Sequence, residues 1–285
     1  MKLVHDVAQW RAYCEHERAR GARIGLVATM GALHTGHATL FDAAKDHGDV
    51  VVATLFVNPR QFNDANDLSR YPTSRVEDRA LASAHGVDLL VEPTLEEMWP
   101  DYPKATPTTV SVRGIGEHYE GDSRPGHFDG VTSVVAKLFA ITGPCRAYFG
   151  EKDFQQLAIV RQMVRDLSFD VEVVSRPIVR DEDGLALSSR NVRLGPVGRQ
   201  RALALSSALA DAGSSPASAD VLRTRLRAHL ADAQIDVVYA DVVNTDTFEP
   251  SRNDEQGEAR ALIAANVDGV RLIDNGPVNL KPEEH

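Results

Sequence analysis

The sequence predicts an α/β protein in which a Rossmann-like parallel sheet domain is followed by a smaller α+β C-terminal domain. Apolar runs alternate with helical patterns through about the first 175 residues, which is typical of βαβ units. The run at 50–57 is apolar almost throughout, as expected for a strand that helices cover on both faces. The pattern changes after Arg176 and Pro177. We therefore expect two domains, 1–175 and 176–285.

The elements of the first domain follow from these patterns. The expected strands are the apolar runs 24–28, 50–57, 87–91, 147–149 and 171–174. The expected helices are 6–20, 36–47, 74–85, 130–141 and 153–167. Ligands of such sheets collect beyond the carboxyl ends of the strands. Three tracts that carry candidate ligand-binding residues directly follow strands, and they are 29–37, 58–62 and 150–156.

The second domain has a different order of elements. Two helices come first, at 196–212 and 219–233, with the turn-rich linker 213–218 between them. Three strands that we expect to be antiparallel follow at 235–243, 259–265 and 270–273. Residues 280–285 are expected to form a frayed tail.

Composition narrows the class of protein. The formal net charge is −10, with 41 acidic against 31 basic residues, which argues against a nucleic-acid surface. No apolar run approaches the ~20 residues of a membrane helix, and the N-terminus does not resemble a signal peptide. Cys14 and Cys145 lie far apart, so we expect two reduced structural thiols. These observations predict a soluble cytoplasmic protein that binds neither nucleic acid nor membrane.

The tract 29–37 is the most informative one, because it joins a strand to a helix through small residues and two histidines. Gly31 and Gly36 allow a sharp turn and a close approach of a ligand. Unsatisfied N–H groups and the positive end of the helix dipole would favour an anion. His34 and His37 can both face that anion. We interpret the tract as a phosphate site, although histidines that only cap the turn are an alternative for this motif alone.

Amides at the sheet rim form a second candidate. Asn58 and Gln61 follow an apolar strand and could hydrogen-bond a hydroxyl or carboxylate without adding charge. An Asx turn begun by Asn58 and Pro59 explains the same residues equally well.

The segment 124–130 precedes an expected helix, with Asp129 or Gly130 as its cap. Arg124 and His127 could reach inward toward an anion. A rigid Pro-Gly turn is the alternative.

The tract 150–156 again lies between strand and helix and carries a lysine, but it is not a Walker A loop. Lys152 would act as a point charge on a phosphate, Asp153 could accept from a ribose hydroxyl, and Gln156 could reach the same pocket. The alternative is that Asp153 caps the helix and Lys152 is solvated.

Near the expected domain junction, two hydroxyls precede a guanidinium at Ser188, Ser189 and Arg190. Such a group can grip phosphate oxygens. A loop hinged there could close over a ligand and exclude water. A capped linker is the alternative.

Taken together, the motifs resemble the pantothenate synthetase (pantoate–β-alanine ligase) family. The tract 34–37 is similar to the HxGH signature of the wider nucleotidylyltransferase superfamily, and 187–190 to the loop that closes over ATP there. The narrower likeness rests on 56–62, 124–128, 150–153 and 183–186 in that order. It covers about residues 1–195 motif by motif.

The resemblance implies an ATP-dependent ligation of pantoate and β-alanine to pantothenate through pantoyl adenylate, with release of pyrophosphate and AMP. It implies ATP with Mg²⁺, no metal site made of protein side chains, a small second domain that acts as a lid, and a homodimer. In-line attack at phosphorus needs positioning and charge neutralisation more than a protein nucleophile. The lack of an evident nucleophilic serine or cysteine fits that chemistry.

Matching motif by motif, the resemblance assigns ATP contacts to Met30, Gly31, Ala32, Leu33, His34, Thr35, Gly36, His37, Gly150, Glu151, Lys152, Asp153, Val179, Leu187, Ser188, Ser189 and Arg190. Val179 would meet the adenine by its backbone. The implied catalytic residues are His34, His37, Lys152, Ser188, Ser189 and Arg190, with His37 as the proton donor. The implied pantoate contacts are Gln61, Gln156, Asn58, Arg124 and His127, and Gln61 would also bind β-alanine.

Three positions depart from the family pattern. Ala28 replaces a usual proline, Arg60 a usual apolar residue and Leu187 a usual methionine. Arg60 adds charge beside the amides of Asn58 and Gln61, which are expected to bind substrate. The sequence does not show whether the Arg60 side chain points toward them or away.

Rival interpretations remain at this stage. Another nucleotidylyltransferase-type enzyme would share the ATP residues, and only Gln61 and Gln156 argue for pantoate as its acceptor. A tRNA synthetase fits poorly with the negative charge and the small second domain. A noncatalytic nucleotide sensor, or a zinc site at His34, His37 and His127, would also use some of these residues.

Overall fold

The structure is a computed structural model that describes residues 1–282. The chain forms two compact units. The first contains Met1–Glu151 and Ile159–Pro177, and the second contains Lys152–Ala158 and the chain from Ile178 onward.

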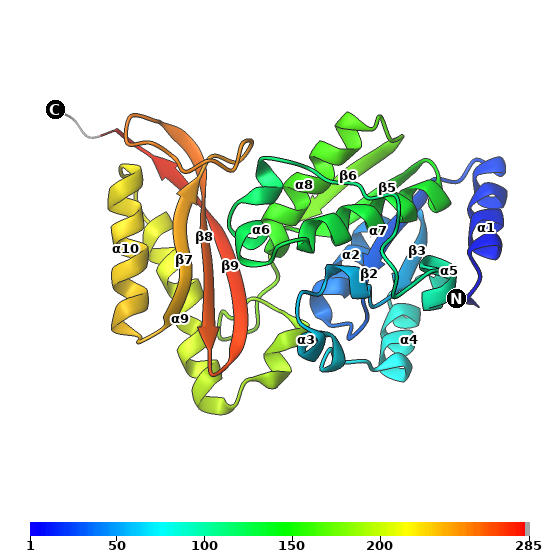
Figure 1. The fold of residues 1–285 in the computed structure, drawn as a ribbon, viewed down its shortest axis with the longest axis horizontal. Helices are drawn as coiled ribbons and strands as arrows, with labels where there is room; N and C mark the ends of the chain where they lie inside the picture. The colour runs from blue at the N-terminus through cyan, green and yellow to red at the C-terminus, as the bar shows by residue number, and fades with distance from the viewer. Residues whose placement is uncertain (283–285) are drawn as a thin grey trace. The chain divides into compact units, whose positions relative to one another are not determined.

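The first unit is built on a six-stranded parallel sheet in the order β1-β4-β3-β2-β5-β6 (Figure 1). The strands are β1 Lys2–Val4, β2 Ile24–Thr29, β3 Val50–Leu55, β4 Leu89–Val91, β5 Cys145–Gly150 and β6 Val171–Arg176. The parallel Rossmann-like sheet confirms the predicted fold class. The edge strand β1 was not predicted, since three residues are too few to show a period.

Helices and short turns connect these strands. They are α1 Val7–Ala19, α2 Thr35–Asp46, η1 Pro59–Gln61, α3 Ala65–Ser69, α4 Arg75–Ala84, α5 Leu95–Met98, η2 Ile115–Glu117, α6 Glu120–Ser123, α7 His127–Thr142, η3 Glu151–Asp153 and α8 Phe154–Asp166. The helix α1 begins as the sequence indicates, because the Asp6 side chain accepts a hydrogen bond from the Gln9 amide at 2.8 Å. The short helices were not predicted, since single turns carry no clear periodicity.

The centre of the sheet is buried on both faces. Five of the six residues of β2 are buried, as are all of β3 beyond Val50. The helices α1 and α7 pack against each other and against β2, while α2 packs on β2, β3 and β5. This coverage explains why these strands are continuous apolar runs.

The sheet contains a switch point between β2 and β5. From β2 the chain adds β3 and β4 on one side, and it later adds β5 and β6 on the other. Ligands of open α/β sheets bind outside the carboxyl ends of the strands at such a point. The tracts that follow β2 and β5 are therefore in the expected place for a ligand site.

Both cysteines are buried, unpaired thiols, as the sequence predicts. Burial raises the pKa of Cys14 to about 11 and that of Cys145 to about 12. At neutral pH neither forms the thiolate that nucleophilic chemistry requires.

The second unit has a three-stranded antiparallel sheet in the order β7-β8-β9, as predicted. Its elements are η4 Ser189–Arg193, α9 Pro196–Gly213, α10 Ala219–Asp232, β7 Asp236–Val243, β8 Gly257–Val267 and β9 Val270–Leu280. The helices α9 and α10 lie along one side of the sheet (Figure 1). Leu205 and Leu226 from these helices join Ile263 of β8 in one apolar core.

Two boundary predictions near the C-terminal end of the described residues are wrong. Strand β9 continues to Leu280. The prediction ends it at 273 because Asp274 and Asn275 are polar and interrupt the apolar pattern, although both are buried in the structure. The predicted tail fails at its start, since Leu280 pairs with Gly257 and the Lys281 amide donates to the Ala217 carbonyl at 3.0 Å. The rest of the predicted tail, 283–285, lies outside the described residues.

The start of α7 also differs from the prediction. The helix begins at His127, after Gly126 with a φ of 78°, so neither Asp129 nor Gly130 is its cap. Gly130 lies inside the helix, where an added Cβ would come within 2.2 Å of the Arg60 carbonyl oxygen. The sequence contains a glycine there because α7 and η1 approach closely, which a local pattern does not reveal.

Across residues 1–282, none of the helices is long and apolar enough to cross a lipid bilayer.

Candidate active site

A buried carboxylate holds the turn that follows β2. Asp78 on α4 is 2% exposed, and it accepts the Ala32 amide at 3.0 Å and the Leu33 amide at 2.6 Å. The Ser74 hydroxyl donates to the same carboxylate at 3.1 Å. Gly31 has a φ of +92°, and a Cβ there would lie 3.1 Å from Asp78 Oδ2. Asp78 therefore fixes the shape of the turn, and Gly31 permits it.

The expectation that this turn offers unsatisfied backbone N–H groups is wrong for most of it. Besides the two amides that Asp78 binds, the His34 amide donates to His37 Nδ1 at 3.3 Å and the Gly36 amide to His34 Nδ1 at 3.2 Å. The side chains of the tract form a capping box at the start of α2 and satisfy these donors themselves.

The same capping box determines what the two histidines present. Their ring centroids are 4.2 Å apart, and both rings are half-buried. Because each Nδ1 accepts a backbone N–H, a neutral ring carries its proton on Nε2. His34 and His37 thus form adjacent donors at the positive end of α2, and a facing anion would meet imidazole N–H groups rather than backbone amides. The capping alternative and the anion-binding interpretation are compatible.

Asn58 is buried at 1% exposure, and all four hydrogen-bonding positions of its amide are used. Its Oδ1 accepts from Trp99 Nε1 at 3.0 Å and from the Arg60 amide at 3.3 Å. Its Nδ2 donates to the Gly130 carbonyl at 3.0 Å and to Gln61 Oε1 at 3.1 Å. This saturation favours a positioning role for Asn58 instead of the predicted contact with a substrate.

Arg124 and His127 also converge on Gln61. His127 Nδ1 lies 2.8 Å from the Gln61 carbonyl oxygen, and an Arg124 terminal nitrogen donates to the same oxygen at 3.3 Å. The Arg124 guanidinium also contacts His127 Nε2 at 3.0 Å. Three of the five residues predicted to bind pantoate thus hold another of them, Gln61, in place.

Gln61 itself connects two of the predicted tracts. Its Nε2 lies 3.1 Å from the Met30 sulfur, so the rim amide contacts the tract 29–37 within the first unit. Arg60 points elsewhere: its guanidinium lies 4.8 Å from the centre of the Trp99 ring and donates to the Lys104 carbonyl at 2.8 Å. The charge of Arg60 is therefore directed at an aromatic side chain and not at the Gln61 amide.

In the second unit, strand β9 holds two of the segments that contain predicted residues. Asn275 Nδ2 donates to the Lys152 carbonyl at 2.8 Å, and Arg260 Nε donates to Asn275 Oδ1 at 2.7 Å. The neighbouring Asp274 accepts two hydrogen bonds from Arg180, at 2.7 and 3.0 Å. Lys152 and the segment that contains Arg180 are consequently both attached to adjacent residues of one strand.

The segment 178–190 is a hairpin followed by a capped turn. The Leu187 amide donates to the Val179 carbonyl at 3.0 Å, which uses one lone pair of the backbone group assigned to adenine. Ser188 caps η4 by accepting the Arg190 amide at 3.2 Å. The cap expected in the capped-linker alternative is therefore present, while the Ser188 hydroxyl hydrogen can still be donated to a ligand.

The predicted site residues fall in both units. The first contains Met30 to His37, Asn58, Gln61, Arg124, His127, Gly150 and Glu151. The second contains Lys152, Asp153, Gln156, Val179 and Leu187 to Arg190. Among residues 1–282, no three His, Cys, Asp or Glu side chains are grouped so that they could hold a metal ion.

Sequence reasoning missed three residues that shape the site. Asp78, Trp99 and Asn275 each lie far in sequence from the residues that they hold. On α4 the buried residues are Asp78 and Ala82, so the one signal for Asp78 is a carboxylate one helical turn before a small apolar residue. No comparable local signal marks Trp99 or Asn275.

Comparisons with known proteins agree over nearly the whole chain. Residues 2–277 match the family model described as pantoate-beta-alanine ligase. The pantothenate synthetase of Anaeromyxobacter dehalogenans is 46% identical over 285 residues, covering 96% of this chain and 98% of that protein. The crystal structure of pantothenate synthetase from Thermus thermophilus matches with a TM-score of 0.88 at 44% identity, covering 97% of this chain and 99% of that one.

A further structure adds ligands. The pantoate-beta-alanine ligase of Francisella tularensis, solved in complex with βγ ATP and β-alanine, matches with a TM-score of 0.80 at 32% identity, covering 97% of each chain. Family model, relatives and solved structures point the same way. The chain belongs to the pantoate–β-alanine ligase family.

Proposed function

We propose that this protein catalyses the ATP-dependent ligation of pantoate and β-alanine. The pantoate carboxylate attacks the α-phosphorus of ATP, and pyrophosphate leaves with the electron pair of the broken P–O bond. The amine of β-alanine then attacks the acyl carbon of pantoyl adenylate. AMP leaves, the amine loses a proton, and the new amide is pantothenate.

The observation that carries this proposal is the adjacency of two kinds of group in the first unit. His34 and His37 present donors suited to phosphate oxygens, and Gln61, suited to an acid substrate, contacts Met30 of the same tract at 3.1 Å. A carboxylate held at Gln61 would therefore lie beside the tract that carries the two histidines. Such positioning is the main requirement of in-line attack.

Each side chain has a defined part in the first step. The Nε2–H groups of His34 and His37 would stabilise charge on the phosphate oxygens, and His37 would supply the proton that the developing anion needs. Lys152 and Arg190 would neutralise phosphate charge, with Ser188 and Ser189 donating hydroxyl hydrogens. Gly150, Glu151, Asp153, Val179 and Leu187 complete the proposed ATP contacts, and Gln156 the pantoate contacts.

We propose that residues of both units act on one ATP molecule, with the second unit serving as a lid. Mg²⁺ would be carried by the phosphates, since this ion usually keeps several water ligands and needs few protein groups. We also propose that the protein acts in the cytoplasm and as a homodimer. Gln61 would contact β-alanine once adenylate has formed.

The direct test measures pyrophosphate and AMP separately. Purified protein with MgATP and pantoate should release pyrophosphate up to about one equivalent per site, and AMP should appear only after β-alanine is added. Omitting pantoate is the matched control. Pyrophosphate release that requires β-alanine, or that proceeds equally without pantoate, would contradict the proposed order and substrate.

A further inference from the structure

We infer that Trp99 is a positioning residue that determines which end of the Gln61 amide faces the acid substrate. This inference rests on the proposed function. It begins with the chemistry of the indole, whose N–H can only donate a hydrogen bond. Trp99 is 6% exposed, and its Nε1 lies 3.0 Å from Asn58 Oδ1.

The indole fixes the orientation of the Asn58 amide. If that amide were rotated by 180°, its NH₂ group would face the N–H groups of Trp99 and Arg60, and its oxygen would face the Gly130 carbonyl oxygen. Each contact that is now favourable would become repulsive. A buried amide in such surroundings has one acceptable orientation.

The orientation of Asn58 then fixes that of Gln61. Asn58 Nδ2 donates to Gln61 Oε1 at 3.1 Å, so the Gln61 oxygen is used internally and Nε2 projects from the other side. Nε2 currently meets the Met30 sulfur at 3.1 Å, which is a weak acceptor. A carboxylate or hydroxyl oxygen of the substrate would be a much better acceptor. A rotated Gln61 would instead present its oxygen and repel a carboxylate.

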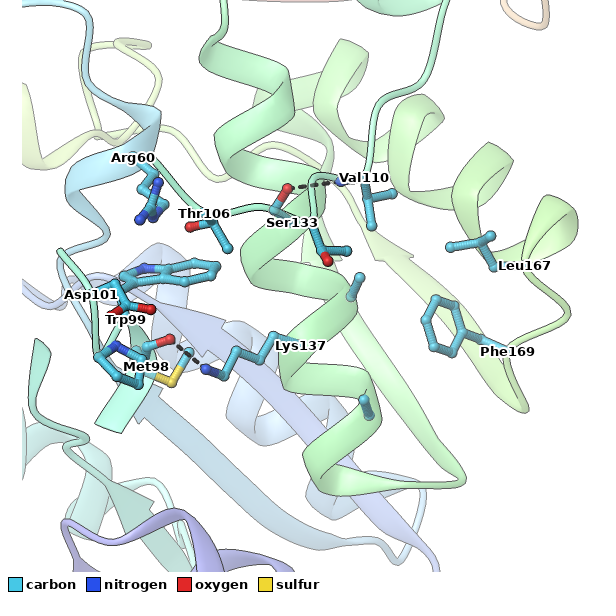
Figure 2. Close-up of a pocket in the computed structure, with 14 residues that line it drawn as sticks. Arg60, Met98, Trp99, Asp101, Thr106, Val110, Ser133, Lys137, Leu167 and Phe169 are labelled. Carbon is cyan, nitrogen blue, oxygen red and sulfur yellow. Dashed lines mark hydrogen bonds between the residues drawn. The ribbon is translucent and has the colours of Figure 1, made fainter. Parts of the chain in front are cut away.

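The Trp99 ring is itself held from several directions. Figure 2 shows the ring between Arg60 and Lys137, whose cationic groups lie 4.8 and 5.1 Å from its centre. Lys137 is tied in turn to the Met98 carbonyl, as the dashed line marks. Residues of both α7 and η1 therefore hold the indole ring whose N–H orients Asn58.

Trp99→Phe removes the donor and keeps an aromatic ring. We expect the KM for pantoate to rise about 5- to 10-fold, the scale of one lost hydrogen bond in a buried network, while the KM for ATP changes by less than about 2-fold. Trp10→Phe is the matched control, since Trp10 is also fully buried in the first unit, and the hydrogen-bonding positions of the Asn58 amide are taken by other groups. It should leave both constants unchanged.

A measurement on the unmutated protein covers the case in which Trp99→Phe does not fold. The chain has two tryptophans, so a ¹⁵N-labelled sample gives two indole N–H resonances. Adding pantoate should shift the Trp99 resonance and leave that of Trp10 in place.

Two results would overturn the role of Trp99 and leave the proposed function standing. One is an active Trp99→Phe protein with an unchanged KM for pantoate, and the other is a Trp99 resonance that does not respond while the wild-type protein turns over pantoate. A wild-type protein that releases no pyrophosphate with pantoate would overturn the proposed function, and with it the positioning role of Trp99.

Discussion

The turn after β2 and the hairpin at 178–190 both carry residues assigned to ATP, yet they are built differently. In the first, a carboxylate that is 2% exposed binds two backbone amides of the turn. In the second, Arg199 holds Asp181 and Asp183 through ion pairs whose side chains are 33 to 36% exposed. Exposed ion pairs contribute little and are screened by salt, whereas a buried, fully bonded carboxylate is costly to disturb.

This difference suits the two segments to different parts in the proposed reaction. The first region is preorganised before any ligand arrives, which suits groups that must stabilise charge in the transition state. The second region is anchored at its base by Arg180 and Asp274, while its tip depends on weak surface contacts. A segment of that kind can adjust when a ligand binds.

The largest expected effect tests the chemistry of the first region. His37→Ala should slow adenylate formation by about 100-fold or more, the scale of a lost acid and a lost phosphate contact. The protein should still fold, since losing a capping partner costs about 1 kcal/mol. Single-turnover pyrophosphate release measures the rate. His85→Ala is the control, because that ring pairs with Asp42 on the surface. Near-normal turnover of His37→Ala would show that His37 is not the proton donor of the adenylation step.

The next effect tests a residue of the second unit outside that hairpin. Lys152→Ala should slow the adenylation step by roughly 10- to 100-fold, because one charge on the phosphates is lost. The reaction of preformed adenylate with β-alanine should change much less. Lys45→Ala, which removes an exposed lysine paired with Asp88, is the control. A defect confined to the β-alanine step would show that Lys152 has another role.

Asp78→Asn breaks the preorganisation of the first region without touching a ligand. Asparagine offers one oxygen where two amides and a hydroxyl now bind, so we expect a loss of about 1 to 3 kcal/mol in unfolding free energy. We also expect adenylation to slow by about 10-fold as the turn loosens. Urea unfolding and single-turnover kinetics measure the two effects. Asp42→Asn should change neither, and equal behaviour of both variants would contradict the role of Asp78.

The smallest effect concerns the tip of the hairpin. Arg199→Gln should raise the KM for ATP by only about 2- to 3-fold at low salt, since exposed pairs contribute little. The difference from the wild-type protein should shrink toward zero near 1 M salt, where such pairs are screened. A KM measured over a salt series checks this. A tenfold effect that salt does not alter would mean that the hairpin is as rigid as the turn after β2.

The contrast also explains what sequence reasoning could find. The strands β2, β3 and β5 and the helices α2, α9 and α10 follow from periodicity, because burial imposes a repeat on the residues. The tracts that follow β2 and β5 could be selected because the carboxyl ends of parallel strands share one edge.

Contacts between residues that are far apart in the sequence produce no such repeat. Asn58, Arg124 and His127 looked like ligand contacts in the sequence, and the structure uses all three to hold Gln61. The split of the chain at 152–158 was hidden as well, since a continuous helix contributes residues to both units. Distances between segments, and not local patterns, decide these questions.

We propose that groups from both units act on the same ATP molecule, and a double-mutant cycle on His37 and Lys152 is the sharpest test of this proposal. Single-turnover adenylation is measured for the wild-type protein, for each alanine variant and for the pair. Groups that stabilise one transition state together should be strongly non-additive, with the pair only slightly slower than the slower single variant. Rate losses that multiply in full would show that the two residues act independently, and would contradict the account.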